Sequence, residues 1–454
     1  MKRIIPLLLA CALLVSCGAP ATQPSGTAST PGHTSLSRLA LKEPVYPAFP
    51  TPPQVPEGDD WDTYFRQEQA YYDAISALRG DGIDEETAAL ILDFATRTTA
   101  QAMRGHEGEN TVYSPLSLWT AMALLAQCAQ GDSRQQVLDA LGSNSIDTLP
   151  GRVSRLWKGL YTDDGTNSLL LANSVWLNND REGHYVQETL DTLAEDYFAG
   201  TYSVPMGHST ADTAVTDWVS EQTGGLIGGD EPVVKTRQDT LALLVSSLYY
   251  RAGWRDEFSP DLTVRDTFTA ADGSEATADF MHKNEDGRFL LGESWQAAAL
   301  STHLGEMVFV LPNEGVTPES LLADPYFLSG LDLSASSSHY GEVQWSVPKF
   351  DADSSLDLLG TLKALGITDL LDPNKSDLSA LSDLDACLSE AKQLARVKVD
   401  EEGVEAAAVT ILTITECAAM MGTEEICVMD LDHPFLFLIR TAGVPLFVGV
   451  VNEI

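Results

Sequence analysis

Few residues of this 454-residue sequence are spaced as the reacting groups of an enzyme are. Its eight histidines are scattered, and no Gly-x-Ser-x-Gly, His-Glu-x-x-His or Gly-x4-Gly-Lys-Ser/Thr motif is present. Asp372, Asn374 and Ser376 alternate as cation ligands do, but no Gly follows and no Glu closes the loop, which favours a solvated turn. A Ser/His/Asp triad assembled only by the fold stays open as an alternative. The motifs otherwise argue against a hydrolase or a metalloenzyme.

The sequence around one cysteine near the start of the chain predicts that this residue is covalently modified. Lys2 and Arg3 precede an apolar run over 4–15, which is too short to span a bilayer. The sequence Leu-Val-Ser-Cys that ends at Cys17 resembles a bacterial lipobox, in which the signal is cut before the cysteine and the thiol is lipidated. We therefore expect residues 1–16 to be a lipoprotein signal peptide. The mature protein would be exported, lipid-anchored to the membrane at Cys17, and exposed at the cell surface or released outside the cell. An ordinary signal peptide with an incidental cysteine is the alternative.

The charge balance excludes one class of partner. The sequence has 27 basic and 66 acidic residues, a formal net charge of −39, so a nucleic-acid backbone would be repelled. Six cysteines are too few to form a disulfide scaffold in a chain of this length, and none stands at zinc-site spacing. We expect no nucleic-acid partner, no metal and no cofactor.

The most informative segment lies near the C-terminus. A strand predicted over 396–400 is followed by Gly403, by the small residues of 406–408, and then by β-branched residues. With a period of two, one face of the segment is nearly all small or apolar; it holds Val404, Ala406, Ala408, Thr410, Leu412 and Ile414. Such a segment could enter the middle of a sheet with no charge on its buried face. A helical turn over 401–408 is the alternative, because Ala and Glu are good helix formers.

The remaining pattern predicts one large mixed α+β domain. Residues 17–58 hold the modified cysteine and a Pro/Ser/Thr-rich tether, and an amphipathic helix follows from Asp59 until Gly80. Further helices are predicted from Asp84, after Ser114-Pro115, and over 209–222 and 357–365. Strands are predicted over 168–177, 240–250, 306–311, 341–347, 396–399 and 435–439. The domain would cover 59–454, with 59–83 as an added N-terminal helical element.

At these residues the sequence resembles the serpin family, over roughly residues 84–454. Blocks typical of the family occur in the expected order: 110–117, 172–177, 217–219 with 223–225, 248–250 with Trp254 and Phe258, 347–350, and 433–437. The resemblance implies the serpin fold, with large mixed or antiparallel sheets, about nine surrounding helices and an exposed reactive loop. It also implies a monomer.

The resemblance further implies a suicide inhibitor of serine proteases. The target protease cleaves the loop, becomes trapped as a covalent acyl-enzyme, and the freed loop inserts as a new strand. The implied hinge comprises Glu402, Gly403, Val404, Glu405, Ala406, Ala407 and Ala408. Val404 stands where the family usually has Thr, and we expect it to insert at least as readily because Val is β-branched and uncharged. A non-inhibitory binding protein of the serpin fold is the alternative, and a lipoprotein hydrolase is a further one.

Five residues correspond to the family's polar groups at the sites where the sheet opens. They are Ser114, Ser117, Ser246, Gln393 and Trp254. Ser246 and Gln393 replace the usual Asn and His. Because a hydroxyl and an amide can hydrogen-bond, we expect this latch to be rebuilt rather than lost.

The cleavage site is predicted by spacing. Fourteen residues after Gly403, the usual distance in the family, the bond lies between Cys417 and Ala418, with Met420 and Met421 as alternatives. No Lys or Arg lies between Glu402 and Arg440, so an elastase-like, chymotrypsin-like or subtilisin-like protease fits better than a trypsin-like one. Cys417 could instead form a disulfide with Cys427.

Overall fold

The computed structural model describes residues 36–53, 56, 60–80, 82–229, 232–405 and 425–454. Its first sheet has eight strands: β1 (Ala40–Lys42), β3 (Thr162–Asp163), β4 (Ser168–Asn178), β5 (Ala199–Val204), β6 (Ala242–Gly253), β12 (Phe350–Asp357), β13 (Lys392–Val399) and β14 (Gly403–Val404). Their order across the sheet is β1-β5-β4-β6-β14-β13-β12, with β3 beside β4. The two-residue strand β14 therefore lies between two long strands.

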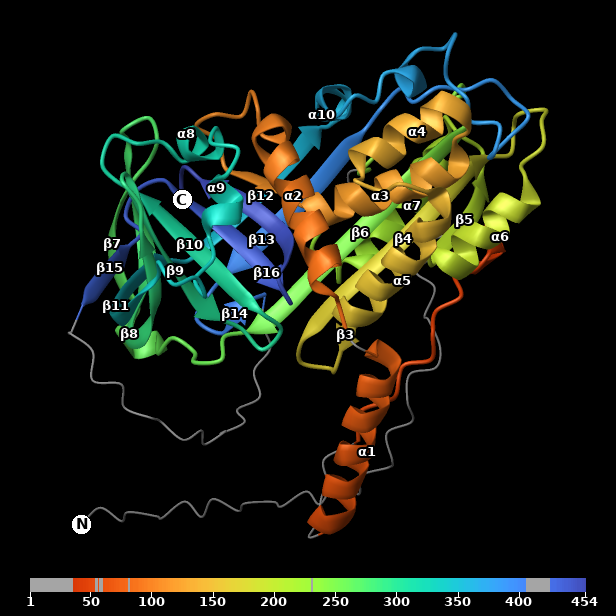
Figure 1. Cartoon of the computed structure of the whole chain (residues 1–454). Helices are drawn as coiled ribbons and strands as arrows, with labels where there is room; N and C mark the ends of the chain where they lie inside the picture. Colours follow the sequence, from red (N-terminus) through yellow and green to blue (C-terminus); the bar gives the residue numbers. More distant parts are fainter. Residues whose placement is uncertain (1–35, 54–55, 57–59, 81, 230–231, 406–424) are drawn as a thin grey trace, which may run out of the picture.

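The second sheet has nine strands. They are β2 (Thr111–Tyr113), β7 (Val264–Thr269), β8 (Glu275–Leu291), β9 (Trp295–Ser301), β10 (Glu306–Pro312), β11 (His339–Pro348), β15 (Ile426–Asp430), β16 (Phe435–Thr441) and β17 (Val444–Val451). Their order is β15-β11-β8-β9-β10-β16-β17-β2, with β7 beside β8. In Figure 1 strands β7, β8, β11 and β15 of this sheet lie at the left, and strands β4, β5 and β6 of the first sheet lie at the right.

Ten α-helices occur in the described residues, close to the number expected. They are α1 (Trp61–Arg79), α2 (Glu85–Ala102), α3 (Pro115–Cys128), α4 (Gly131–Ala140), α5 (Leu149–Leu160), α6 (Gln187–Asp196), α7 (Ser209–Gln222), α8 (Pro318–Leu322), α9 (Phe327–Gly330) and α10 (Leu359–Ala364). Four 3-10 turns lie at Leu36–Arg38, Ile146–Thr148, Pro260–Leu262 and Asp369–Leu371.

Local sequence explains where several helices begin. The Asp84 carboxylate accepts a hydrogen bond from the Thr87 N–H at 2.7 Å and caps α2, as expected of an N-terminal Asp. The Ser114 hydroxyl caps α3, whose first residue is Pro115. The helix predicted over 209–222 has these same bounds in α7.

The first sheet separates two hydrophobic cores, because alternate residues of a strand point to opposite faces. On one face Tyr250 and Ala252 of β6 join the main core, which extends under α3 and through the second sheet. On the other face Leu243 and Val245 of the same strand pack on a smaller core with Trp218 of α7. The parity of a residue in β6 therefore decides which core its side chain enters.

Part of the predicted tether packs on the domain. β1 pairs with β5 and extends the edge of the first sheet, while the Tyr46 ring stacks on Trp157 with centroids 5.1 Å apart. The Phe49 ring lies 4.6 Å from that of Tyr161. These aromatic contacts supply the buried area that the Pro-rich composition lacks.

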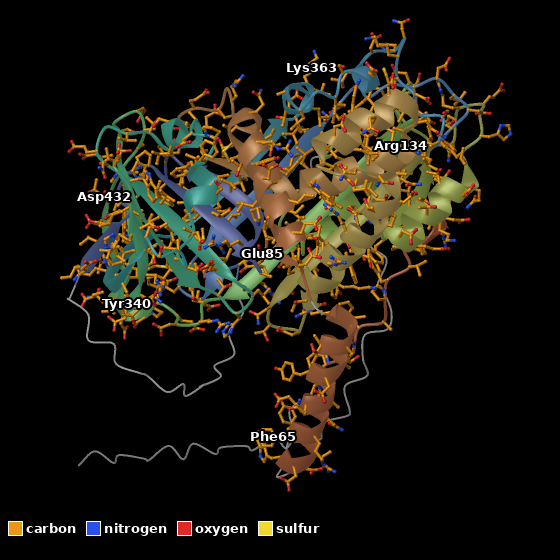
Figure 2. The ribbon with its side chains drawn as sticks, in the orientation of Figure 1. Phe65, Glu85, Arg134, Tyr340, Lys363 and Asp432 are labelled. Carbon is orange, nitrogen blue, oxygen red and sulfur yellow. The ribbon has the colours of Figure 1, made fainter. Side chains whose placement is uncertain are left out.

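The added helix α1 is found where the sequence predicted it, but it extends from the body. It has no buried residue, and Figure 2 shows Phe65 near its outer end. None of the helices in the described ranges is long and apolar enough to cross a membrane.

Candidate functional site

Strand β14 begins the candidate site by entering the first sheet between β6 and β13. Gly403 pairs with Gly253, and Val404 pairs with both Ala252 and Val399. The Glu405 N–H still donates to the Lys398 carbonyl at 3.1 Å. The segment from 401 to 405 is thus a bend and a strand, not the helical turn that its composition allowed.

Gly403 is required by the closeness of β6. A Cβ on this residue would lie 2.4 Å from the Ala252 carbonyl oxygen, a distance that real side chains do not tolerate. The glycine therefore lets the backbone of β14 approach near enough to pair.

Trp254 holds the turn that leads into β14. Its indole N–H donates to the Asp400 carbonyl at 2.9 Å, and its backbone N–H donates to the Glu402 carbonyl at 3.0 Å. The side chain is buried, so these hydrogen bonds are shielded from water. Trp254 fixes both ends of the bend at Glu401 and Glu402.

Glu401 anchors the same bend by an ion pair. Lys349 Nζ lies 2.9 Å from one carboxylate oxygen, and the Thr263 hydroxyl donates to the other at 3.0 Å. Burial opposes ionisation, but the hydrogen bonds from Lys349 and Thr263 outweigh it and hold the pKa of Glu401 below its ordinary value. The carboxylate is therefore ionised at neutral pH.

Glu405 is where the described chain leaves the sheet. Its φ is +44°, in the left-handed region that a residue with a side chain rarely adopts. The Tyr249 hydroxyl donates to its carboxylate at 2.7 Å. Burial raises the pKa of Tyr249 and this hydrogen bond raises it further, so the phenol remains a donor.

A cavity of about 470 Å³ opens beneath Val404 between β6 and β13. In the described chain these strands share no ladder with each other, since only β14 pairs with both. The walls come from α3, α7 and the two strands, and include Leu118, Val219, Leu244, Leu248, Leu394 and Val397. We call this cavity the slot. Within the described residues it is a mostly apolar gap between two strands whose facing edges are unpaired beyond β14.

The floor of the slot is held by Ser114 and Gln393. The Ser114 N–H donates to the Gln393 side-chain oxygen at 2.7 Å, and the Gln393 amide donates back to the Ser114 carbonyl at 2.9 Å. The Ser114 hydroxyl donates to the Leu446 carbonyl at 2.7 Å, and its oxygen lies 3.1 Å from the Ser117 hydroxyl oxygen. Ser246 lines the slot but does not bond Gln393, so the amide is joined to backbone instead of to the expected hydroxyl.

A family model described as Serpin (serine protease inhibitor) matches residues 89–454. The chain belongs to the serpin family. It is 30% identical over 370 residues to serpin-Z2B of Triticum aestivum, covering 76% of this chain and 90% of that protein. It is 26% identical over 395 residues to plasminogen activator inhibitor 1 of Neovison vison, covering 82% and 94%. The solved structure of the thermophilic serpin tengpin in its native state matches with a TM-score of 0.72 and 25% identity, covering 82% of this chain and 95% of that one.

Several predicted site residues of this serpin lie outside the described residues. These are Ala406, Ala407, Ala408, Cys417, Ala418, Met420, Met421 and the predicted lipidation site Cys17. Glu402, Gly403, Val404 and Glu405 of the hinge are described, and the chain resumes at Glu425 before β15.

Cys427 on β15 is a buried free thiol. Burial raises its pKa to about 11, so it is protonated and unreactive at neutral pH. Cys417, the other residue of the alternative disulfide, lies outside the described residues. In the described part of the serpin, no three His, Cys, Asp or Glu side chains gather as metal ligands.

Tyr249 and Lys349 are site residues that the sequence motifs did not predict. Both were visible only as members of family blocks, with no chemical role attached. Their roles depend on pairing between segments far apart in the sequence, which no local pattern reveals.

Proposed function

We propose that this serpin inhibits a serine protease by cleavage of its reactive loop, trapping of the acyl-enzyme and insertion of the freed loop into the slot. The single observation that carries the proposal is the position of β14. A strand has already begun between β6 and β13, and beneath it lies a gap with strand edges on both sides. Such edges are templates for an added strand.

The register of β14 supports the proposal when it is extended down the slot. Val404 pairs with Ala252 and Val399, so an inserted residue 405 would lie between Arg251 and Lys398. Residue 410 would lie between Ser246 and Gln393. Thr410 is the only polar residue of 404–414 on the core-facing side, and this register would bring it to the two polar residues on the slot floor.

Charge is also consistent with insertion. Side chains with the parity of Val404 would face the main core, and those with the parity of Glu405 would face the side of α7. Glu405 would therefore stay off the core face and lie between two cations. Each inserted residue would gain about 1 kcal/mol of net hydrogen bonding, and about 25 cal/mol per Å² of buried apolar area, which together make a large driving force.

The target we propose is elastase-like, chymotrypsin-like or subtilisin-like. The stretch between Glu402 and Arg440 holds no Lys or Arg for the specificity pocket of a trypsin-like enzyme. Cys417 and Ala418 flank the proposed bond, with Met420 and Met421 as alternatives. These are small or unbranched apolar side chains.

The test mixes the purified domain with elastase, chymotrypsin, subtilisin and trypsin and examines the products on a denaturing gel. We expect an adduct at the summed mass with at least one of the first three and none with trypsin. Mass spectrometry of the released C-terminal peptide identifies the bond. Nicked protein without adduct across the panel would contradict inhibition and favour a non-inhibitory binding protein.

We also propose that the protein is exported and anchored to a membrane through lipid on Cys17. The basic, apolar and small-residue order of residues 1–18 supports this. Expression in a bacterial host with labelled palmitate should label the wild-type protein and leave Cys17→Ser unlabelled. Equal labelling of both, or of neither, would contradict the anchor.

A further inference from the structure

The bond between Tyr249 and Glu405 lies at the point where insertion would have to proceed. Tyr249 is buried on β6 and its hydroxyl donates to the Glu405 carboxylate at 2.7 Å. Glu405 accepts this hydrogen bond while its backbone has a φ of +44°. An extended β residue cannot keep this backbone angle, so the contact belongs to a chain that has stopped entering the sheet.

The register shows which level of the slot the Glu405 side chain reaches, although its backbone N–H still bonds Lys398. In an extended strand residue 405 would pair with Arg251 and Lys398, because Val404 pairs with Ala252 and Val399. Its carboxylate instead reaches Tyr249, two residues further along β6. Tyr249 and Arg396 flank this deeper level of the slot from its two sides. The Glu405 side chain therefore reaches the level at which residue 407 would pair in the inserted strand.

The surroundings of Tyr249 fix the phenol in place. A Cβ on Gly224, in the turn after α7, would lie 3.1 Å from the Tyr249 hydroxyl, so the turn packs closely on the ring. Across the slot Arg396 donates to the Leu226 carbonyl of the same turn at 3.2 Å, and it holds Asp351 through two hydrogen bonds of 2.6 and 2.7 Å. The turn after α7 thus links the two sides of the slot around the phenol.

We propose that Tyr249 is a positioning residue that restrains the hinge at Glu405 and sets the rate at which the loop enters the slot. This role rests on the proposed inhibitory function. For the loop to enter, the hydrogen bond between the Tyr249 phenol and the Glu405 carboxylate must break and the Glu405 backbone must become extended. The Glu405 carboxylate would then lie beside the Arg251 and Lys398 side chains instead. The hydrogen bond therefore stabilises the uncut form and is absent from the inserted form.

The test compares Tyr249→Phe with Tyr250→Phe. The first removes the hydroxyl that holds Glu405 and keeps the ring against Gly224. The second is a matched control, because the Tyr250 hydroxyl bonds Thr302 at 2.6 Å in the core and does not contact the hinge. Each variant is melted uncut and after cleavage of the loop, and the loss of inhibition on incubation at 37 °C is timed.

We expect Tyr249→Phe to lower the Tm of the uncut form by about 1–3 °C and to leave the cleaved form unchanged. Spontaneous loss of inhibition should be about fivefold faster in Tyr249→Phe than in the wild type, which is the rate change expected from losing one hydrogen bond to a charged group. Tyr250→Phe should lower the Tm of both forms. Glu405→Gln keeps an acceptor for the phenol and should fall between wild type and Tyr249→Phe.

Two outcomes overturn the restraint and are distinguishable. If the wild type gains stability on cleavage but Tyr249→Phe lowers both forms equally, Tyr249 has only a structural role. If the wild type gains no stability on cleavage, the proposed insertion is wrong and the restraint fails with it.

Discussion

Val404 is the last described residue whose side chain pairs across the sheet with both neighbouring strands. It is buried and faces the main core together with Ala252 and Val399. A charge at this position could stay in solvent only if the two-residue strand β14 left the sheet, whereas the fully inserted strand would have to bury it in an apolar environment.

If the protein inhibits as proposed, Val404→Arg should therefore convert it into a substrate. We expect the number of inhibitor molecules consumed per protease molecule trapped to rise by at least about tenfold, because burying an unpaired charge costs more than 1.4 kcal/mol. Titration of protease activity against inhibitor concentration measures this ratio. Val404→Thr, which restores the residue usual in the family, is the control and should inhibit as the wild type does. Undiminished inhibition by Val404→Arg would refute insertion at this position.

The Glu401 and Lys349 pair gives the hinge anchor a defined pH dependence. The pKa of Glu401 is lower in the folded protein than its ordinary value of 4.5. Its contribution to folding stability is therefore fully present above pH 4.5 and is lost as the pH falls through the folded pKa. The pKa of Lys349 is raised by the same hydrogen bond, so the pair also weakens at high pH, from 10.5 upward. The anchor is therefore strongest across the neutral range.

Melting of the uncut protein as a function of pH tests this anchor. Glu401→Gln should melt below the wild type at pH 7, and the two curves should converge as the pH falls below about 4.5. A constant difference down to pH 3 would show that the ion pair is not its source.

At the scale of elements, the segment before α1 acts as part of the domain. Phe49 lies on Tyr161 and Tyr46 lies on Trp157, while β1 completes the edge of the sheet. These contacts fix residues that composition alone assigns to a tether. Composition reports the average tendency of a segment, and a few aromatic rings are enough to override it.

Phe49→Ala should destabilise the uncut protein by about 1–2 kcal/mol, since it removes a partly buried ring that packs against Trp157 and Tyr161. Phe65→Ala on α1 is the matched control, because that ring is 56% exposed and its loss should change stability by less than about 0.5 kcal/mol. Urea unfolding midpoints compare the two. Equal effects would mean that the segment before α1 does not contribute to the fold.

The elements themselves could largely be read from the sequence. Apolar runs located β4, β6 and β16, and the capping residues Asp84 and Ser114 located the starts of two helices. The position of β14 could not be read, because two residues carry too little pattern to specify partners on distant strands. The same limit hid the partners of Glu401 and Glu405, which lie between β11 and β12, just before β7, and on β6.

At the scale of the whole molecule, the described residues of this serpin leave a strand position unfilled at the centre of the first sheet. Strand β14 lies between the long strands β6 and β13 and has only two residues in the described chain. Beyond it, a cavity of about 470 Å³ lies between mostly apolar walls. Unpaired strand edges and unfilled volume both raise the free energy of the folded chain relative to a state that fills them. We expect the uncut protein to be kinetically trapped above that state.

Thermal unfolding of the uncut protein and of the protein cleaved within 417–421 measures that difference directly. Filling the slot with about ten residues should raise the Tm by at least about 10 °C, because each adds ladder hydrogen bonds and buried area. A cleaved form that melts at the same temperature as the uncut form would show that no strand enters the slot.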